Sequence, residues 1–250
     1  MFLKRLANQK KKPLRVAIIG ASGGIGSALV GQLSNSNHVE TIYALSRTRL
    51  QTLQVDKKAQ WLPIDLLDEE TIEKAANEIE KNGTVDVVII ASGLLHTENI
   101  KPEKDWRMLE SQSMSALFAI NTIGPALVMK HFAPVLPKGG RSIIAALSAR
   151  VGSISDNRLG GWYSYRASKA ALNQIIRTFS VELSRKNKDA VLLGLHPGTV
   201  STNLSEPYQA NNYERFTPQQ SAEYLLSVID QADPSMTGKV YDWKGDIIPE

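Results

Sequence analysis

The sequence predicts an α/β fold, a single doubly wound domain built on a seven-stranded parallel sheet. Short β-branched runs alternate along the chain with longer segments of helical period. Several of these runs, such as Val-Ala-Ile-Ile, are apolar throughout, as is typical of strands buried on both faces of a parallel sheet. The 250 residues contain no internal repeat and no linker-like break, so they fit one domain rather than two.

Seven runs are predicted to be strands. In chain order they are residues 15–20, 40–46, 60–65, 85–92, 141–148, 190–196 and 239–243. The segments of helical period between and after them are residues 25–33, 68–81, 104–135, 163–185 and 218–231. Asp68 is a suitable N-cap for the second of these helices, and Asn82-Gly83 is expected to end it.

Composition excludes several kinds of chemistry. The chain has no cysteine, so disulfides, thiolate zinc sites, iron–sulfur clusters and cysteine nucleophiles are ruled out. Its four histidines lack the paired spacing of metal ligands, and no metal site is expected; they are His38, His96, His131 and His196. No run approaches 18 apolar residues, and no apolar signal segment follows the basic N-terminus. We therefore expect a cytoplasmic protein without a membrane partner.

The formal net charge of +4 originates at the N-terminus. Six of the 29 Lys and Arg residues lie among the first 15 residues, and the rest of the chain carries slightly more acid than base. Residues 1–13 are therefore predicted to be a solvated, partly frayed basic tail, and residues 14–250 the folded domain. Contact of this tail with RNA or anionic lipid is the alternative, but the folded surface itself predicts no nucleic-acid partner.

A glycine-rich turn links the first predicted strand to the first helix. Its sequence is Gly20-Ala21-Ser22-Gly23-Gly24-Ile25-Gly26. Glycines permit a tight turn and let backbone N–H groups approach a phosphate at the helix N-terminus, where the helix dipole favours an anion. Between the first strand and first helix of an alternating pattern, such a turn predicts a dinucleotide site.

A tyrosine and a lysine lie four residues apart near the start of the fourth predicted helix. Tyr165 and Lys169 therefore share one helix face. An ammonium close to a phenol, together with an oxidised nicotinamide, lowers the pKa of the phenol, whose reference value is near 10. The pair is predicted to exchange a proton with a substrate oxygen.

These motifs together resemble the short-chain dehydrogenase/reductase family over residues 14–250. The turn has the family's Gly-x3-Gly-x-Gly spacing, and Tyr165-Arg166-Ala167-Ser168-Lys169 follows at the family's distance. Residues 148–162 are similar to the branch that contains C-factor and sniffer-type carbonyl reductases. The resemblance implies a Rossmann-type fold, a nicotinamide cofactor, and a homodimer or homotetramer that packs residues 104–135 and 163–185 against their symmetry mates.

The end of the second predicted strand indicates which nicotinamide cofactor is used. In a dinucleotide fold, an acidic residue here accepts the ribose 2′-hydroxyl and repels a 2′-phosphate. The sequence has Ser46 and Arg47 instead, which can hold a 2′-phosphate through charge-assisted bonds. We therefore predict NADP(H). The resemblance implies further cofactor contacts at Asp65, Leu66, Ser92, Gly93, Pro197, Gly198, Val200 and Thr202.

Asn121 is predicted to take part in catalysis through its backbone. Pro125, four residues on, has no N–H to donate to the carbonyl of Asn121, which leaves that carbonyl free for water or a side chain. The resemblance implies that a water bound there continues a proton relay from Lys169.

The catalytic serine departs from the family pattern. By strict register the family's serine falls on Ala149, so the neighbouring hydroxyl of Ser148 is predicted to contact the substrate oxygen, with Ser153 as the alternative. The Asn-Asn pair that the family has after the fourth strand is Ile90-Ala91 here.

We therefore expect an oxidoreductase that transfers a hydride between NADP(H) and a small-molecule carbonyl or alcohol. Tyr165 would exchange the proton, Lys169 would bind ribose and tune Tyr165, and Ser148 would bond the carbonyl oxygen. The polar segment 201–217 is expected to line the substrate pocket. The alternative is an NADP(H)-binding regulatory or cell–cell signalling protein with vestigial activity, which the altered serine register favours and the intact Tyr–Lys pair opposes.

Overall fold

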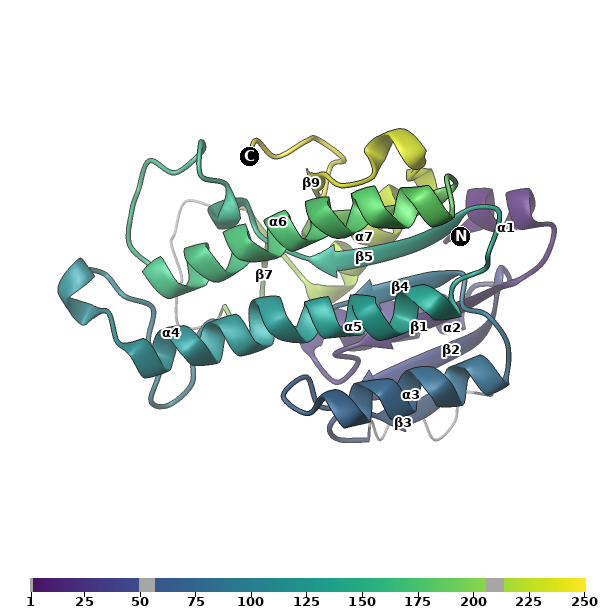
Figure 1. Cartoon of the computed structure of the whole chain (residues 1–250), viewed down its shortest axis with the longest axis horizontal. Coiled ribbons are helices and arrows are strands. Elements are labelled where there is room, and N and C mark those ends of the chain that lie inside the picture. The colour runs from purple at the N-terminus through teal and green to yellow at the C-terminus, as the bar shows by residue number, and fades with distance from the viewer. Residues whose placement is uncertain (1, 50–56, 206–213) are drawn as a thin grey trace.

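The computed structural model describes residues 2–49, 57–205 and 214–250, and it confirms the doubly wound α/β fold (Figure 1). Seven parallel strands form one sheet in the order β3-β2-β1-β4-β5-β6-β9. The strands are β1 (Leu14–Ile19), β2 (Val39–Ser46), β3 (Ala59–Pro63), β4 (Val87–Ile90), β5 (Ser142–Leu147), β6 (Ala190–His196) and β9 (Val240–Asp242). The chain order reverses between β1 and β4, and a crevice for a ligand is expected at the carboxyl ends of the strands on either side of such a reversal.

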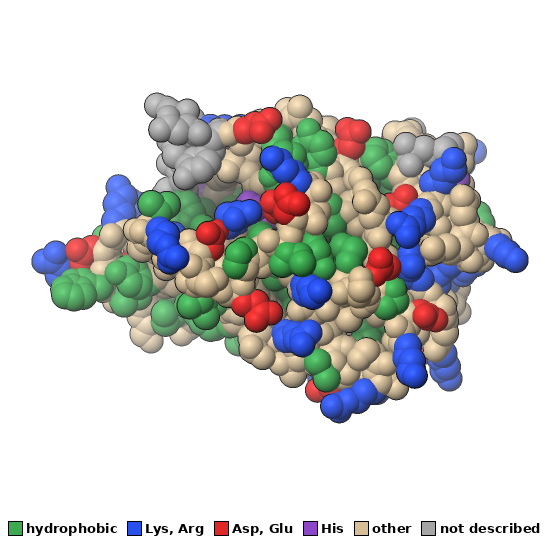
Figure 2. Space-filling model, turned by 90° about the horizontal axis from the view of Figure 1, so that it is seen from above, with side chains coloured by type: hydrophobic (Ala, Val, Ile, Leu, Met, Phe, Trp, Pro, Cys, Tyr) green, Lys and Arg blue, Asp and Glu red, His purple; other side chains and the backbone are tan. Residues whose placement is uncertain are grey.

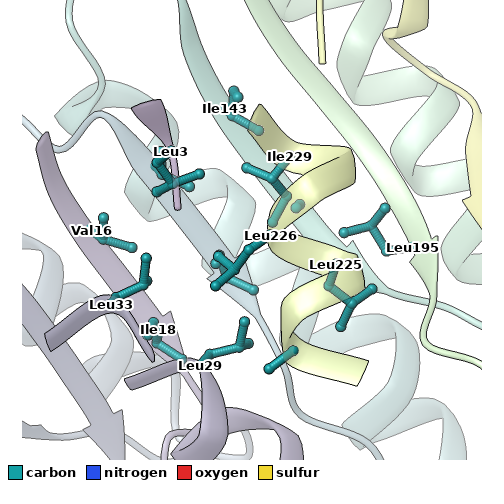
Figure 3. Packing of buried hydrophobic residues seen from close by; sticks show 14 of the residues in the cluster. Leu3, Val16, Ile18, Leu29, Leu33, Ile143, Leu195, Leu225, Leu226 and Ile229 are labelled. Carbon is teal, nitrogen blue, oxygen red and sulfur yellow. The ribbon is translucent and has the colours of Figure 1, made fainter. Parts of the chain in front are cut away.

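Two layers of helices cover the sheet. On one face lie α2 (Gly24–Ser34) and α7 (Pro218–Gln231), whose leucines pack on the side chains of β1, as Figure 3 shows. On the other face lie α3 (Glu69–Lys81), α5 (Gly124–Phe132) and α6 (Tyr163–Lys186). Side-chain caps begin two of these helices: Asp68 accepts from Glu70 N at the start of α3, and Thr217 forms a capping box with Gln220 at the start of α7. Only the first of these caps was expected from the sequence.

The predicted helix 104–135 begins later than expected and is interrupted. A 3₁₀ turn at Trp106–Met108 precedes α4 (Ser111–Phe118), and a π-helical turn, Ala119–Ile123, joins α4 to α5. In this turn Gly124 N donates to Ala119 O, one residue beyond the α-helical partner. Pro125 explains the interruption, because it has no N–H for the carbonyl of Asn121 and its ring crowds that carbonyl.

The rod Ser111–Val135 is long and apolar enough to cross a membrane by length and composition, with a mean hydropathy of 1.2. No helix of this kind was expected from the sequence. The apolar window is 44% buried within the fold, and Val128, Met129 and Phe132 are fully buried against the sheet. Packing in the core therefore accounts for much of the apolar character of this rod.

The expectation that the N-terminus is solvated and frayed is wrong. Residues Lys4–Lys10 form α1, and Leu3 and Leu6 are fully buried against the α2–α7 layer. The carboxylate of Asp230 on α7 accepts Arg5 N at 3.2 Å and Leu6 N at 3.0 Å. Lys10 Nζ lies 2.7 Å from the buried carboxylate of Asp86. Two leucines and one buried ion pair thus anchor a segment whose charge alone suggested a tail.

The surface seen in Figure 2 carries basic and acidic side chains side by side, without a large field of one sign. Helix α1 lies at the end of the molecule opposite to the carboxyl ends of the strands (Figure 1). Its basic residues are therefore remote from the edge of the sheet where a ligand site is expected.

Replacement of Leu6 by alanine is expected to lower the free energy of unfolding by about 2–5 kcal/mol, because a fully buried leucine leaves a cavity. Lys4→Ala, on the exposed side of α1, is the matched control and should change stability by less than about 0.5 kcal/mol. Urea denaturation measures both. Equal stability of the Leu6→Ala variant and the wild type would show that α1 does not pack on α7 in solution.

Candidate active site

The glycine-rich turn lies where the chain passes from β1 to α2. Gly20 has a positive φ of 82°, and a Cβ there would lie 2.9 Å from Ser92 N at the end of β4. At Gly26 a Cβ would lie 2.1 Å from Gly20 O, so only glycine lets the first turn of α2 close over the end of β1. The sequence therefore folds this turn tightly at the centre of the sheet, beside the reversal of strand order.

The N-terminus of α2 is left open by this turn. Its N-cap, Gly23, makes no side-chain cap bond, and Ser22, Gly23 and Gly24 are exposed. The first N–H groups of a helix lack intrahelical partners and carry the positive end of the helix dipole. A Cβ on Gly24 would lie 2.7 Å from Thr202 Cγ2, so the structure brings Thr202 onto the turn. This arrangement can bind a phosphate or pyrophosphate.

Tyr165 and Lys169 lie on one face of α6, as predicted, with Lys169 Nζ 5.9 Å from the centre of the Tyr165 ring. Lys169 is only 2% exposed, and its Nζ donates to Leu147 O at 2.8 Å. Burial lowers the pKa of Lys169 to about 8. Burial also raises the pKa of Tyr165 to about 12. In the protein alone, desolvation of the phenol thus outweighs the neighbouring ammonium, and the phenol is protonated at neutral pH.

The lowered pKa of Lys169 predicts a pH dependence of stability. In the unfolded chain Lys169 keeps its proton up to about pH 10.5, whereas in the folded protein it loses the proton near pH 8. Between these values the unfolded state binds more protons, so the free energy of unfolding rises with pH, by about 3 kcal/mol across the window. Urea denaturation at pH 7 and pH 10 should show this rise in the wild type relative to Lys169→Met. If the free energy of unfolding changed with pH in the same way in both proteins, Lys169 would not have the lowered pKa.

Asn121 is fully buried in the π-helical turn and braces the chain after β4. Its Nδ2 donates to Leu94 O and its Oδ1 accepts from Leu94 N, both at 2.8 Å. Gly93 lies beside it: a Cβ there would be 3.7 Å from Asn121 Oδ1 and 3.8 Å from Lys169 Nζ. The structure therefore brings Gly93, Asn121 and Lys169 together, although they come from three separate elements.

Ser148 directly follows β5, and its hydroxyl points to Asn173 on α6 rather than to Tyr165. The Ser148 Oγ donates to Asn173 Oδ1 at 2.6 Å, two helical turns from Tyr165. Ala149 follows in extended conformation and is 8% exposed. The alternative, Ser153, accepts Asp156 N at 3.1 Å and shapes the loop after β5. The proton of Ser148 is therefore engaged elsewhere in this conformation, and its predicted role stays a prediction.

The remaining predicted cofactor residues border the same edge of the sheet. Asp65 Oδ1 accepts Leu67 N at 3.0 Å, and Leu66 packs so close to Gly124 that a Cβ there would lie 2.7 Å from Leu66 Cβ. Ser92 Oγ is buried and has no hydrogen-bond partner among the described residues. Such an orphaned hydroxyl fits a site that receives a polar ligand.

The chain after β6 borders this edge as well. Pro197 O accepts Ser221 Oγ at 2.9 Å, and Gly198 has a φ of 78°. Val200 is buried, and it belongs to a two-stranded sheet formed by β7 (Thr199–Val200) and β8 (Arg215–Phe216). Of the segment 201–217 that was expected to line the substrate pocket, residues 206–213 lie outside the described residues.

Two titratable residues that burial shields from solvent received no role from the sequence. Glu103 is 3% exposed, and its carboxylate accepts Ser164 N at 3.2 Å and the Ser164 hydroxyl, at the first turn of α6. His196 ends β6, and burial lowers the pKa of its imidazole to about 4, so it is neutral. Glu103 lies 61 residues from its partner, and no local sequence pattern marks such a contact.

Comparison with known proteins identifies the family. Residues 15–212 match the model of the short chain dehydrogenase family. A 1-hydroxy-2-glutathionyl-2-methyl-3-butene dehydrogenase of Rhodococcus sp. is 29% identical, over 90% of this chain and 94% of that protein. The C-signal protein of Myxococcus xanthus is 33% identical, over 67% of this chain and 93% of that protein. The chain belongs to the short-chain dehydrogenase family.

Solved structures share the fold. The carbonyl reductase Sniffer of D. melanogaster superposes with a TM-score of 0.84 at 23% identity, over 95% of this chain and all of that chain. An NADPH-bound carbonyl reductase from chicken fatty liver gives 0.83 at 23% identity, over 96% of this chain and 95% of that chain. Membership of this family makes the chain an oxidoreductase by descent, and its substrate has to be inferred from the site.

Proposed function

We propose that this protein is an NADP(H)-dependent carbonyl reductase. The observation that carries the proposal is the convergence of Lys169, Asn121 and Gly93 beside Tyr165, at the edge of the sheet where the glycine-rich turn opens. The chicken and D. melanogaster proteins that share the fold are both described as carbonyl reductases, and the chicken protein is described as NADPH-bound. These descriptions support the proposal for this chain.

The residues at the edge of the sheet fit a dinucleotide. The exposed N-terminus of α2 offers backbone donors to the pyrophosphate. Thr202, from the chain after β6, packs against Gly24 in this turn. Arg47 is exposed at the end of β2, where it can bond a 2′-phosphate. Asp65 and Leu66 follow β3 at the same edge of the sheet, and the resemblance implies that they contact the cofactor too. When bound, NADPH supplies a hydride to the carbonyl carbon.

The chain's own groups manage the proton. Because burial raises the pKa of Tyr165 to about 12, its phenol is protonated at neutral pH and can donate to the oxygen of a carbonyl that is being reduced. Lys169 returns a proton through the relay predicted with Asn121. Its pKa of about 8 is close to the working pH, as proton transfer requires.

Ser148 remains the proposed second donor to the carbonyl oxygen, on the condition that its hydroxyl turns away from Asn173. Breaking that bond costs about 1 kcal/mol, whereas a donor to a developing oxyanion contributes about 2.7–4 kcal/mol. The turn is therefore favourable in the transition state.

Ser148→Ala is expected to lower kcat by roughly ten- to a hundred-fold. This factor corresponds to the stabilisation of the oxyanion by the hydroxyl less the cost of breaking the bond to Asn173. The Kd for NADPH should remain unchanged, and Ser153→Ala is the control. Steady-state assays and calorimetry measure the two constants. If Ser148→Ala keeps the wild-type rate and Ala149→Ser raises it, the donor belongs at residue 149 and not at 148.

The oxidoreductase proposal is tested by a panel of ketones and aldehydes with NADPH and with NADH, followed by loss of the absorbance of the reduced cofactor. Turnover of at least one carbonyl, faster with NADPH, is expected. Binding of NADPH without turnover of any carbonyl would favour the second candidate, a regulatory or signalling protein. That candidate is supported by the likeness to the C-signal protein and by the alanine at residue 149.

The proposed homodimer or homotetramer would use α4, α5 and α6. Leu172 and Ile176, which lie within the segment 163–185 that the resemblance places at the contact, are fully buried in the core of the chain itself. Ile123, in the π-helical turn between α4 and α5, and Val181, on α6, are 53% and 41% exposed, and this exposed apolar surface supports the proposal. Light scattering at micromolar concentration distinguishes a monomer from an oligomer.

A further inference from the structure

The hydroxyl of Ser46, at the end of β2, is already engaged on both sides. Its Oγ donates to Thr48 O at 2.7 Å and accepts from Trp61 Nε1 at 3.2 Å. A serine hydroxyl has one proton to donate, and a phosphate dianion only accepts. In this conformation Ser46 therefore shapes the turn that follows β2 and has no proton left for a 2′-phosphate.

Trp61 reaches Ser46 from the neighbouring strand. It lies on β3 opposite Ala44, two residues before Ser46, so the two side chains are diagonal neighbours on one face of the sheet. The Trp61 ring is partly buried against the α2–α7 layer, and Ser46 is 3% exposed. A packed indole thus fixes the direction of a buried hydroxyl, and the hydroxyl fixes the carbonyl of Thr48, next to the exposed Arg47.

We propose that Trp61 is a positioning residue for cofactor selection: its indole N–H holds the Ser46 hydroxyl on Thr48 O and so presents Arg47 to the 2′-phosphate. The inference rests on the proposed use of NADP(H). A turn that is already shaped loses less conformational freedom when Arg47 binds, so the brace strengthens binding without touching the ligand. It acts on the phosphate contact alone, since the pyrophosphate site at the N-terminus of α2 is built from other residues.

The test uses two fragments that differ by one phosphate, 2′,5′-ADP and 5′-AMP, titrated by calorimetry into the full-length protein. Trp61→Phe keeps the ring and removes the N–H. We expect it to weaken the binding of 2′,5′-ADP by about threefold to tenfold, which is the effect of one neutral hydrogen bond. The affinity for 5′-AMP should not change. Trp106→Phe, which alters an exposed tryptophan on another element, is the matched control.

Ser46→Ala and the double variant complete the cycle. If Trp61 acts through Ser46, the losses for 2′,5′-ADP will not add, because either change removes the same brace. Equal weakening of both fragments by Trp61→Phe, or additive losses, would overturn the inference and leave the NADP(H) proposal intact. A wild-type protein that binds 2′,5′-ADP no more tightly than 5′-AMP would overturn the NADP(H) proposal, and the inference with it.

Discussion

Tyr165→Phe is expected to lower kcat for carbonyl reduction by about three orders of magnitude, while the Kd for NADPH stays within a few-fold. The change removes the proton donor and keeps the ring, which packs edge-on against Trp162 with the ring centres 6.2 Å apart. A positioned general acid contributes roughly 10²–10⁴-fold, and loss of its bond to the developing oxyanion adds to that. Single-turnover kinetics and calorimetry measure the rate and the affinity.

Tyr163→Phe is the control for this variant. Tyr163 lies two residues away on α6 and is 38% exposed, and Ala167 follows it at the position that would have to be a lysine. Its loss should leave kcat close to that of the wild type. A Tyr165→Phe variant with more than about a tenth of the wild-type rate would be too active for a protein whose only acid is this phenol.

Arg47→Asp is expected to weaken the binding of NADPH by about a hundred-fold. The affinity for NADH should stay unchanged or rise slightly. Charge-assisted bonds to a phosphate are stronger than neutral ones, and a carboxylate in their place repels the 2′-phosphate. A free 2′-hydroxyl, by contrast, can donate to that carboxylate. Fluorescence titration of the two reduced cofactors measures the change in preference.

Arg185→Asp makes the same change of charge at the exposed C-terminal end of α6. It controls for the loss of net positive charge, which by itself weakens any anionic ligand. An unchanged NADPH/NADH preference in Arg47→Asp would mean that Arg47 does not contact the phosphate. The preference for NADP(H) would then need another basic residue.

The fold could be predicted because its signals are local. Each predicted strand, such as the run that became β4, is a short β-branched stretch between helical segments. The glycine-rich turn also marks its own place, since Gly20 and Gly26 admit no Cβ. The Tyr165–Lys169 pair needs only the period of one helix to predict a shared face.

The parts that could not be predicted depend on contacts between distant residues. Leu3 and Leu6 are isolated apolar residues in a basic segment of the sequence. They belong to the core because they pack against α7, which is more than 200 residues away in the chain. The bond from Ser148 to Asn173 spans 25 residues, and the bond from Trp61 to Ser46 crosses between two strands. The rise in the pKa of Tyr165 was not predicted, because residue spacing reveals a nearby charge but says nothing about burial.

The most direct test of carbonyl reduction follows the transferred atom. NADPH that carries deuterium at C4 of the nicotinamide, prepared separately for each face, is incubated with the protein and its best carbonyl substrate, and the product is analysed by mass spectrometry. We expect an alcohol with one deuterium on the former carbonyl carbon, from NADPH labelled on one face only. Tight binding of NADPH together with no labelled alcohol from any carbonyl would contradict it.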